Sequence, residues 1–188
     1  MRVFLAVSGG EPFHRALTTA LDGWRAGGAG RLKVRWTRPE TWHLTLQFLG
    51  DWPEDRLEGL KSALEEARDQ APFVLTPGRV GGFPDLKRPR VLFLHMDDDG
   101  QAAALAGRIR KSVGEFWPDG PQDTRPFQSH LTLARIRESL SRADVKLFQE
   151  MELGDLSPIM VEGFHLLASE RRPAGPRYET LAFFPLRK

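Results

Sequence analysis

The sequence His-Leu-Thr-Leu occurs twice in this chain, at residues 43–46 and at residues 130–133. In each copy apolar and polar residues alternate, which predicts a half-buried β-strand. Side chains two positions apart on a strand point to the same face, so each copy presents a histidine beside a threonine, with leucines packed behind. A single His-x-Thr triplet is a weak signal, but two four-residue copies on strand-like segments are difficult to attribute to chance. If the two strands face each other, one imidazole lies on each side of a shared space.

The predicted elements also repeat in order. Each half of the chain is predicted as a strand, a helix, a His-x-Thr strand and a second helix, with nearly the same spacing between corresponding positions. The first helix of each half has apolar residues at helical spacing, starting at Phe13 in one half and at Leu105 in the other. The repeat therefore predicts an α+β fold with two pseudo-symmetric lobes. Each lobe is expected to be an antiparallel sheet with helices on the outside, and the lobes face each other across a central cleft.

The lobe boundaries follow from the same pattern. We expect residues 1–188 to form a single domain, with one lobe made of roughly residues 1–75 and the C-terminal strands, and the other of residues 90–160. The stretch 76–90 is rich in proline and glycine, so we predict a loop that connects the halves. Its basic residues are predicted either as solvated linker positions or as contacts to phosphates beyond the reacting one. These residues are Arg79, Lys87, Arg88 and Arg90.

The other segments are predicted from periodicity and from turn residues. We expect strands over residues 2–7, 34–36, 160–169 and 178–184. One further helix is expected to begin near Asp51 and another to span residues 141–151, and residues 27–30 are expected to form a glycine-rich loop.

Composition narrows the class of protein. The chain has 188 residues, of which 40% are hydrophobic, and it contains five tryptophans, so a real core is expected. The net charge of +2 does not support a broad polyanion-binding surface, so any basic footprint must be local. The absence of cysteine excludes disulfides, thiolate nucleophiles and cysteine-ligated zinc. The first apolar run is too short for a signal peptide or a membrane span, and we expect a soluble, cytoplasmic monomer.

Both motifs and the segments around them resemble the 2H phosphoesterase superfamily. Within it the chain is similar to the RNA 2′,3′-cyclic phosphodiesterases, historically called 2′-5′ RNA ligases. The segments that carry the resemblance, besides the motifs, are residues 2–7, Val34-Arg35-Trp36, Phe48-Leu49-Gly50, Gly82-Phe83-Pro84, Arg88–Leu92, Arg125-Pro126-Phe127 and Phe184-Pro185-Leu186. The resemblance implies a substrate that is an RNA with a 2′,3′-cyclic phosphate terminus or a nucleotide cyclic phosphate. It also implies hydrolysis that leaves a 2′-phosphate.

This chemistry explains the residue types. Water attacks phosphorus on one side while the ribose O3′ leaves on the other, so one group must accept a proton and a second must donate one. Histidine, with an unperturbed pKa of about 6.5, supplies both forms near neutral pH. By resemblance His43 is the proton donor to O3′ and His130 is the base on water, although the symmetry of the sequence does not distinguish the roles. Thr45 and Thr132 are expected to bind the non-bridging phosphate oxygens, and neither a metal nor a cofactor is expected.

The positions five residues after each histidine are Phe48 and Arg135. We predict that they bind the substrate base, with the ring stacking on one side and the guanidinium on the other. Strict alternation opposes this prediction because an odd offset points to the opposite face, and a β-bulge or an early strand end would resolve the conflict. The other histidines lack the motif and are predicted to be structural or surface residues: His14, His95 and His165.

Several other functions are compatible with the same motifs. One is reversible joining of RNA halves through a 2′-5′ bond. A second is hydrolysis of a small cyclic nucleotide such as an ADP-ribose cyclic phosphate. The non-enzymatic alternative is a module that binds RNA ends, which the intact histidines and threonines disfavour.

Overall fold

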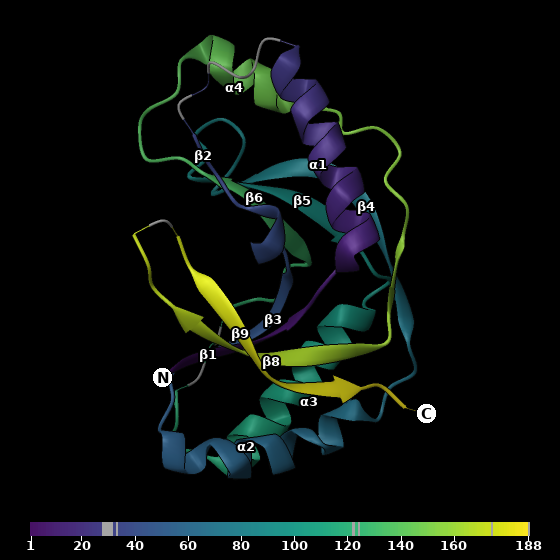
Figure 1. The fold of residues 1–188 in the computed structure, drawn as a ribbon, viewed down its shortest axis with the longest axis vertical. Coiled ribbons are helices and arrows are strands. Elements are labelled where there is room, and N and C mark those ends of the chain that lie inside the picture. Colours follow the sequence, from purple (N-terminus) through teal and green to yellow (C-terminus); the bar gives the residue numbers. More distant parts are fainter. Residues whose placement is uncertain (28–31, 33, 122, 124, 174, 188) are drawn as a thin grey trace.

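The computed structural model describes residues 1–27, 32, 34–121, 123, 125–173 and 175–187 (Figure 1). Its strands are β1 (Arg2–Val7), β2 (Arg35–Trp36), β3 (Leu44–Asp51), β4 (Phe73–Phe83), β5 (Val91–Asp97), β6 (His130–Arg135), β7 (Ile159–Val161), β8 (Gly163–Glu170) and β9 (Arg177–Pro185). Its α-helices are α1 (Gly10–Ala26), α2 (Leu57–Leu64), α3 (Gln101–Phe116) and α4 (Arg142–Gln149). Short 3-10 helices are η2 (Pro39–Thr41), η3 (Glu54–Arg56) and η4 (Glu66–Arg68).

The two His-x-Thr segments form strands, as the alternation predicted. The second motif opens β6 at His130, and β3 begins at Leu44, one residue after the first motif histidine. The apolar face predicted for the first helix is buried in α1. Residues 28–30 of the predicted glycine-rich loop lie outside the described residues.

The loop prediction for residues 76–90 is wrong over its first half, because β4 continues to Phe83 and pairs with β5. Pro77 lies at a register irregularity of this pair, where a missing backbone N–H is tolerated. Gly81 lies under the ring of Phe93, and a Cβ there would come within 2.4 Å of that ring. Proline and glycine in this stretch therefore serve a bulge and a close packing contact rather than a turn.

All neighbouring strands pair in antiparallel fashion, in the order β7-β4-β5-β6-β3-β1-β8-β9, with β2 beside β6. The α+β class and the antiparallel sheet are as predicted. The two motif strands, β3 and β6, are neighbours at the centre of this order. Among the described residues they pair at one register position, Leu44 with Leu131. The two halves of the sheet diverge on either side of this contact (Figure 1).

The helices cover the outer sides of both halves. Helices α2 and α3 lie against the half that contains β1, β3, β8 and β9, while α1 and α4 lie against the half that contains β4, β5 and β6 (Figure 1). The first helix of each half of the chain thus covers strands of the other half, which differs from the lobe ranges expected from the sequence. Periodicity shows that a helix has an apolar face, but not which sheet that face covers. The buried apolar residues form one contiguous cluster.

In the described part of the chain, no helix is both long and apolar enough to cross a membrane.

Candidate active site

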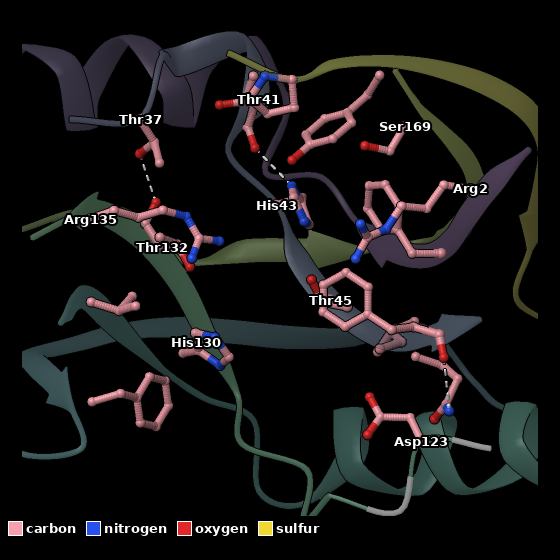
Figure 2. A pocket seen from close by; sticks show the side chains of 18 of the residues that line it. Arg2, Thr37, Thr41, His43, Thr45, Asp123, His130, Thr132, Arg135 and Ser169 are labelled. Atoms are coloured by element: carbon pink, nitrogen blue, oxygen red, sulfur yellow. Dashed lines mark hydrogen bonds between the residues drawn. The ribbon is translucent and has the colours of Figure 1, made fainter. Parts of the chain in front are cut away.

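A cleft of about 890 Å³ lies between the two halves of the sheet. Figure 2 shows His43 and Thr45, at the start of β3, facing this space from the side opposite to His130 and Thr132 of β6. All six residues predicted for the site line the same cleft: His43, Thr45, Phe48, His130, Thr132 and Arg135. The leucines between them, such as Leu44 and Leu131, are buried behind the cleft wall. The structure therefore brings together every residue of the predicted site.

The two motif histidines are held in the same way. The Nδ1 atom of His43 lies 2.7 Å from the carbonyl oxygen of Thr41, and Nδ1 of His130 lies 2.7 Å from that of Gln128. A carbonyl oxygen can only accept a hydrogen bond, so Nδ1 carries the hydrogen in both rings. In the neutral imidazole, Nε2 is then the unprotonated nitrogen, which can accept a proton. Each ring is thus fixed in the tautomer that leaves Nε2 as the acid-base atom.

Each imidazole is also flanked by two aromatic rings. His43 lies 4.9 Å from the ring of Phe4 and 5.2 Å from that of Tyr178, measured between centroids. His130 lies 5.1 Å from Phe83 and 5.3 Å from Phe93. These rings exclude water, and the repeat of this packing at both motifs extends the pseudo-symmetry beyond the motif itself.

Burial controls the protonation of both imidazoles. The pKa of His43 is lowered to about 4, mainly because loss of hydration disfavours the imidazolium and in part because of the nearby charges of His130 and Arg135. Burial also lowers the pKa of His130, with smaller contributions in the same direction from His95, Arg125 and Arg135. The hydrogen bonds to backbone carbonyls oppose these effects in both cases. Without an anion in the cleft, His43 is therefore neutral at pH 7.

Two β-bulges explain how Phe48 and Arg135 reach the cleft. The register of β3 on β1 skips Leu46, and the register of β6 on β5 skips Leu133. In each strand the extra residue and its successor are both buried, so the alternation is reset after the motif. The two bulges stand at the same position of the repeat, three residues after each histidine. The bulge that the sequence required is thus present in both strands.

Arg125, Asp123 and Tyr178 are among the cleft residues that were not predicted from the sequence as site residues. The guanidinium of Arg125 lies 5.5 Å from the centroid of the Phe48 ring and forms two hydrogen bonds with Asp123, of 2.8 and 2.6 Å. This ion pair lowers the pKa of Asp123, mainly through the hydrogen bonds. Tyr178 reaches the cleft from β9, where no spacing relates it to either motif. The sequence signal that could have indicated Arg125 as a site residue is its position as a basic residue five positions before His130.

The cleft is strongly basic. Eight arginines line it, at positions 2, 35, 38, 110, 125, 135, 137 and 171. Within the described residues, Asp123 is the one carboxylate of the lining, and it is already paired with Arg125. A basic footprint concentrated in this cleft agrees with a net charge of only +2, because the charge is local rather than spread over the surface.

The remaining sequence predictions concern residues outside the cleft. His14, His95 and His165 are not among its lining residues, nor are the four basic residues of the 76–90 stretch. His95 is nevertheless the cross-strand partner of His130. Among the described residues, no group of three or more histidine, aspartate or glutamate side chains is arranged to hold a metal ion.

A half-buried threonine, Thr37, connects the two motif segments. The Oγ1 atom of Thr37 lies 2.8 Å from the carbonyl oxygens of both Thr132 and Leu133 and accepts a 2.8 Å hydrogen bond from Nε1 of Trp42. Trp42 directly precedes His43. The hydroxyl, shown in Figure 2, therefore links the segment that carries the first histidine to the backbone of the second motif.

A family model described as LigT like phosphoesterase matches residues 14–93 and again residues 97–178. The chain belongs to this family. Each matched segment contains one His-x-Thr motif, as expected for a duplicated unit. The family membership agrees with the resemblance found in the sequence.

Individual members of the family cover the full chain. A protein of Thermus thermophilus named RNA 2′,3′-cyclic phosphodiesterase is 34% identical over an alignment of 197 residues, which covers 100% of this chain and 91% of the relative. A protein of the same name from Archaeoglobus fulgidus is 30% identical over 186 residues, covering 98% and 99% of the two chains. A crystal structure of a Thermus thermophilus protein superposes with a TM-score of 0.77 at 33% identity and covers 100% of this chain and 98% of its own.

Proposed function

We propose that this protein hydrolyses 2′,3′-cyclic phosphate ends of RNA to 2′-phosphate ends, without a metal ion. The observation that carries the proposal is the pair of imidazoles on opposite sides of one basic cleft, each with Nδ1 bonded to a backbone carbonyl. Their Nε2 atoms are then available for proton transfer at the two apical positions of an in-line reaction. The names of the Thermus and Archaeoglobus relatives support the same substrate class.

In the proposed reaction, His130 accepts a proton from the attacking water and His43 donates one to O3′ as it leaves. Thr45 and Thr132 donate hydrogen bonds to the non-bridging oxygens and hold the phosphate. His43 can act as an acid only after its pKa rises, because burial holds it at about 4 in the free protein. A bound phosphate supplies that change, since an opposite charge within about 4–6 Å favours the imidazolium by about 1–3 pKa units. Substrate binding and protonation of His43 are therefore coupled.

Replacement of either histidine by alanine tests the proposal. His43→Ala and His130→Ala should each lower turnover of an oligonucleotide with a 2′,3′-cyclic end by about 10²–10⁴-fold. The product should carry its phosphate on the 2′ position. Retained turnover in the double variant would contradict the proposal, and tight binding of the cyclic end without turnover by the unsubstituted protein would favour a binding module.

The assignment of donor and acceptor is tested separately. A phosphodiester with a nitrophenolate leaving group needs no proton at the departing oxygen, so it should restore much of the rate lost in His43→Ala but little of that lost in His130→Ala. The opposite pattern would exchange the two roles. Full activity in excess chelator is expected, and loss of activity that added zinc restores would overturn the metal-independent mechanism.

A further inference from the structure

Three of the arginines that line the cleft come from separate elements. Strand β2 contributes Arg35, the end of β6 contributes Arg135, and the turn between β8 and β9 contributes Arg171. Gly175, which follows Arg171 in this turn, lies close to β2: a Cβ on Gly175 would lie 3.3 Å from the guanidinium of Arg35. Nearby, Arg38 donates a 3.2 Å hydrogen bond to the carbonyl oxygen of Pro176. These contacts define one wall of the cleft that neither motif strand forms alone.

Two of these arginines repel each other. Arg35 and Arg135 are direct cross-strand partners in the antiparallel pair of β2 and β6. Directly opposed side chains lie on the same face, and like charges in this position destabilise a sheet. Among the described residues, no carboxylate lies within ion-pair distance of Arg35, Arg135 or Arg171. An anion bound between the two guanidiniums would relieve this repulsion.

The neighbouring Arg38 differs from Arg35 and Arg135 in having a carboxylate partner. Its guanidinium lies 3.3 Å from Glu40, so its charge is compensated within the protein. Arg35 and Arg135 lack such a partner although both are exposed and line the cleft. Guanidinium groups bind phosphate through two parallel hydrogen bonds, so a phosphate matches the donors of a facing arginine pair.

The subsite lies next to the reacting centre. The charge of Arg135 acts on both motif histidines, so its side chain is close to the position of the cyclic phosphate. In an RNA end, the nearest second anion is the phosphate on O5′ of the same ribose. We propose that Arg35 and Arg135, with Arg171, form a second phosphate subsite that binds the phosphate on O5′ of the terminal nucleotide. This inference rests on the proposed function for the position of the cyclic end.

The subsite is compatible with the base-binding role predicted for Arg135. A guanidinium can stack a base on its flat face while its N–H edge donates to a phosphate in the plane of the group. Arg135 would then contact the base and the phosphate of one nucleotide, and Arg35 would contact the phosphate alone. Substitution of Arg35 therefore tests the phosphate contact without altering the contact to the base.

A binding experiment tests the subsite without turnover. Titration calorimetry would compare adenosine 2′-phosphate with adenosine 2′,5′-bisphosphate on the unsubstituted protein, Arg35→Gln and Arg35→Lys. The unsubstituted protein should bind the bisphosphate at least about tenfold more tightly, as expected for a charge-assisted hydrogen bond. Arg35→Gln should remove most of this preference and Arg35→Lys should keep part of it, because the charge remains but the fork is lost. Arg108→Gln, which changes an exposed arginine of α3 outside the cleft lining, should leave both affinities unchanged.

A kinetic experiment identifies the source of the phosphate. Adenosine 2′,3′-cyclic phosphate with a 5′-hydroxyl group, the same compound with a 5′-phosphate, and a diadenosine dinucleotide with a cyclic end are compared as substrates. Arg35→Gln should raise KM for the two substrates with a phosphate on O5′ about tenfold more than KM for the 5′-hydroxyl compound. A larger effect on the dinucleotide indicates an RNA chain, and a larger effect on the 5′-phosphate indicates a small nucleotide.

The two proposals fail separately. Equal affinity of the unsubstituted protein for the two adenosine phosphates, or an equal loss of both in Arg35→Gln, would overturn the subsite. Absence of hydrolysis of all three cyclic substrates would overturn the proposed function, while the calorimetric comparison would still measure the subsite. Unchanged thermal unfolding of Arg35→Gln is the control for folding.

Discussion

At the scale of single residues, the two imidazoles have nearly identical surroundings. Each donates its Nδ1 hydrogen to the carbonyl of the residue two positions earlier, and each lies between two aromatic rings. The hydrogen bond fixes the tautomer of each ring. Burial of each ring reduces its hydration and so lowers the pKa of the imidazole. The consequence is an imidazole whose charge depends on the ligand.

Protonation of His43 should therefore respond to phosphate. NMR titration of its imidazole is expected to give a pKa of about 4 in the free protein, and a pKa raised by about 1–3 units when inorganic phosphate or adenosine 2′-phosphate is bound. His14, which packs against Trp42 outside the cleft, serves as the internal reference. A pKa of His43 that does not change on binding would contradict the proposed coupling.

The same shift should make stability depend on pH. Since the pKa of His43 is about 4 in the folded protein and about 6.5 in an unfolded chain, the unfolded state binds more protons between these values. The free energy of unfolding should thus fall as the pH is lowered from 6.5 toward 4, by on the order of 2–3 kcal/mol from this residue. Urea unfolding at pH 7 and pH 4.5 measures the change. His43→Gln should lose less stability over this range than the unsubstituted protein.

Phe48 provides a test of base stacking. Its ring is 39% exposed and stands beside Arg125 in the cleft, so its removal should cost little stability. Stacking of a base on an aromatic ring contributes about 1–3 kcal/mol, so Phe48→Ala should raise KM for a cyclic nucleotide by about tenfold or more. Phe183→Ala is the matched control, because that ring is 50% exposed but does not line the cleft. Equal KM values for the two variants would remove Phe48 from the site.

At the scale of elements, the bulges in β3 and β6 determine which side chains enter the cleft. The alternation of each motif was sufficient to predict the strands and the four motif residues. The bulge positions were not predictable, because Leu46-Gln47 and Leu133-Ala134 carry no signal that separates a paired residue from an extra one. Tyr178 was missed for a different reason, since only the tertiary pairing of β8 with β1 brings β9 to this site.

The hydroxyl of Thr37 should position one motif strand on the other. Thr37→Val leaves the indole N–H of Trp42 without its acceptor, so the free energy of unfolding should fall by about 1–3 kcal/mol. Turnover should fall while KM changes little, because the predicted phosphate-binding and base-binding residues are unchanged but the segment that carries the first histidine loses its link to the second motif. Thr37→Ser should restore both quantities, and Thr19→Val, which alters an exposed threonine on α1, is the control. Unchanged turnover in a folded Thr37→Val protein would exclude a positioning role.

At the scale of the whole molecule, the exchange of helices binds the two lobes into one unit. Helix α1 covers strands of the second half of the chain, and α3 packs on β3 from the first half. The duplication was predictable from the sequence because both copies keep the motif and the helix spacing. The exchange was not predictable, since the apolar face of a helix is equally suited to either sheet.

Unfolding should accordingly be a single cooperative transition. Far-UV circular dichroism and tryptophan fluorescence are expected to give the same urea midpoint, because neither lobe has a complete core without a helix from the other half. The Trp52–Trp117 pair lies near α3, and the Trp24–Trp36 pair lies near α1, so fluorescence reports on both ends. Two separated transitions would indicate lobes that fold independently.

The pairing of Leu44 with Leu131 has a wider consequence. Each of these residues directly follows a motif histidine, so the span between the two imidazoles is set by main-chain geometry. Loops, turns and rim side chains can then diverge to suit new nucleotides while the reacting groups keep their separation. Within such a scaffold, selectivity can change independently of the proton transfer chemistry.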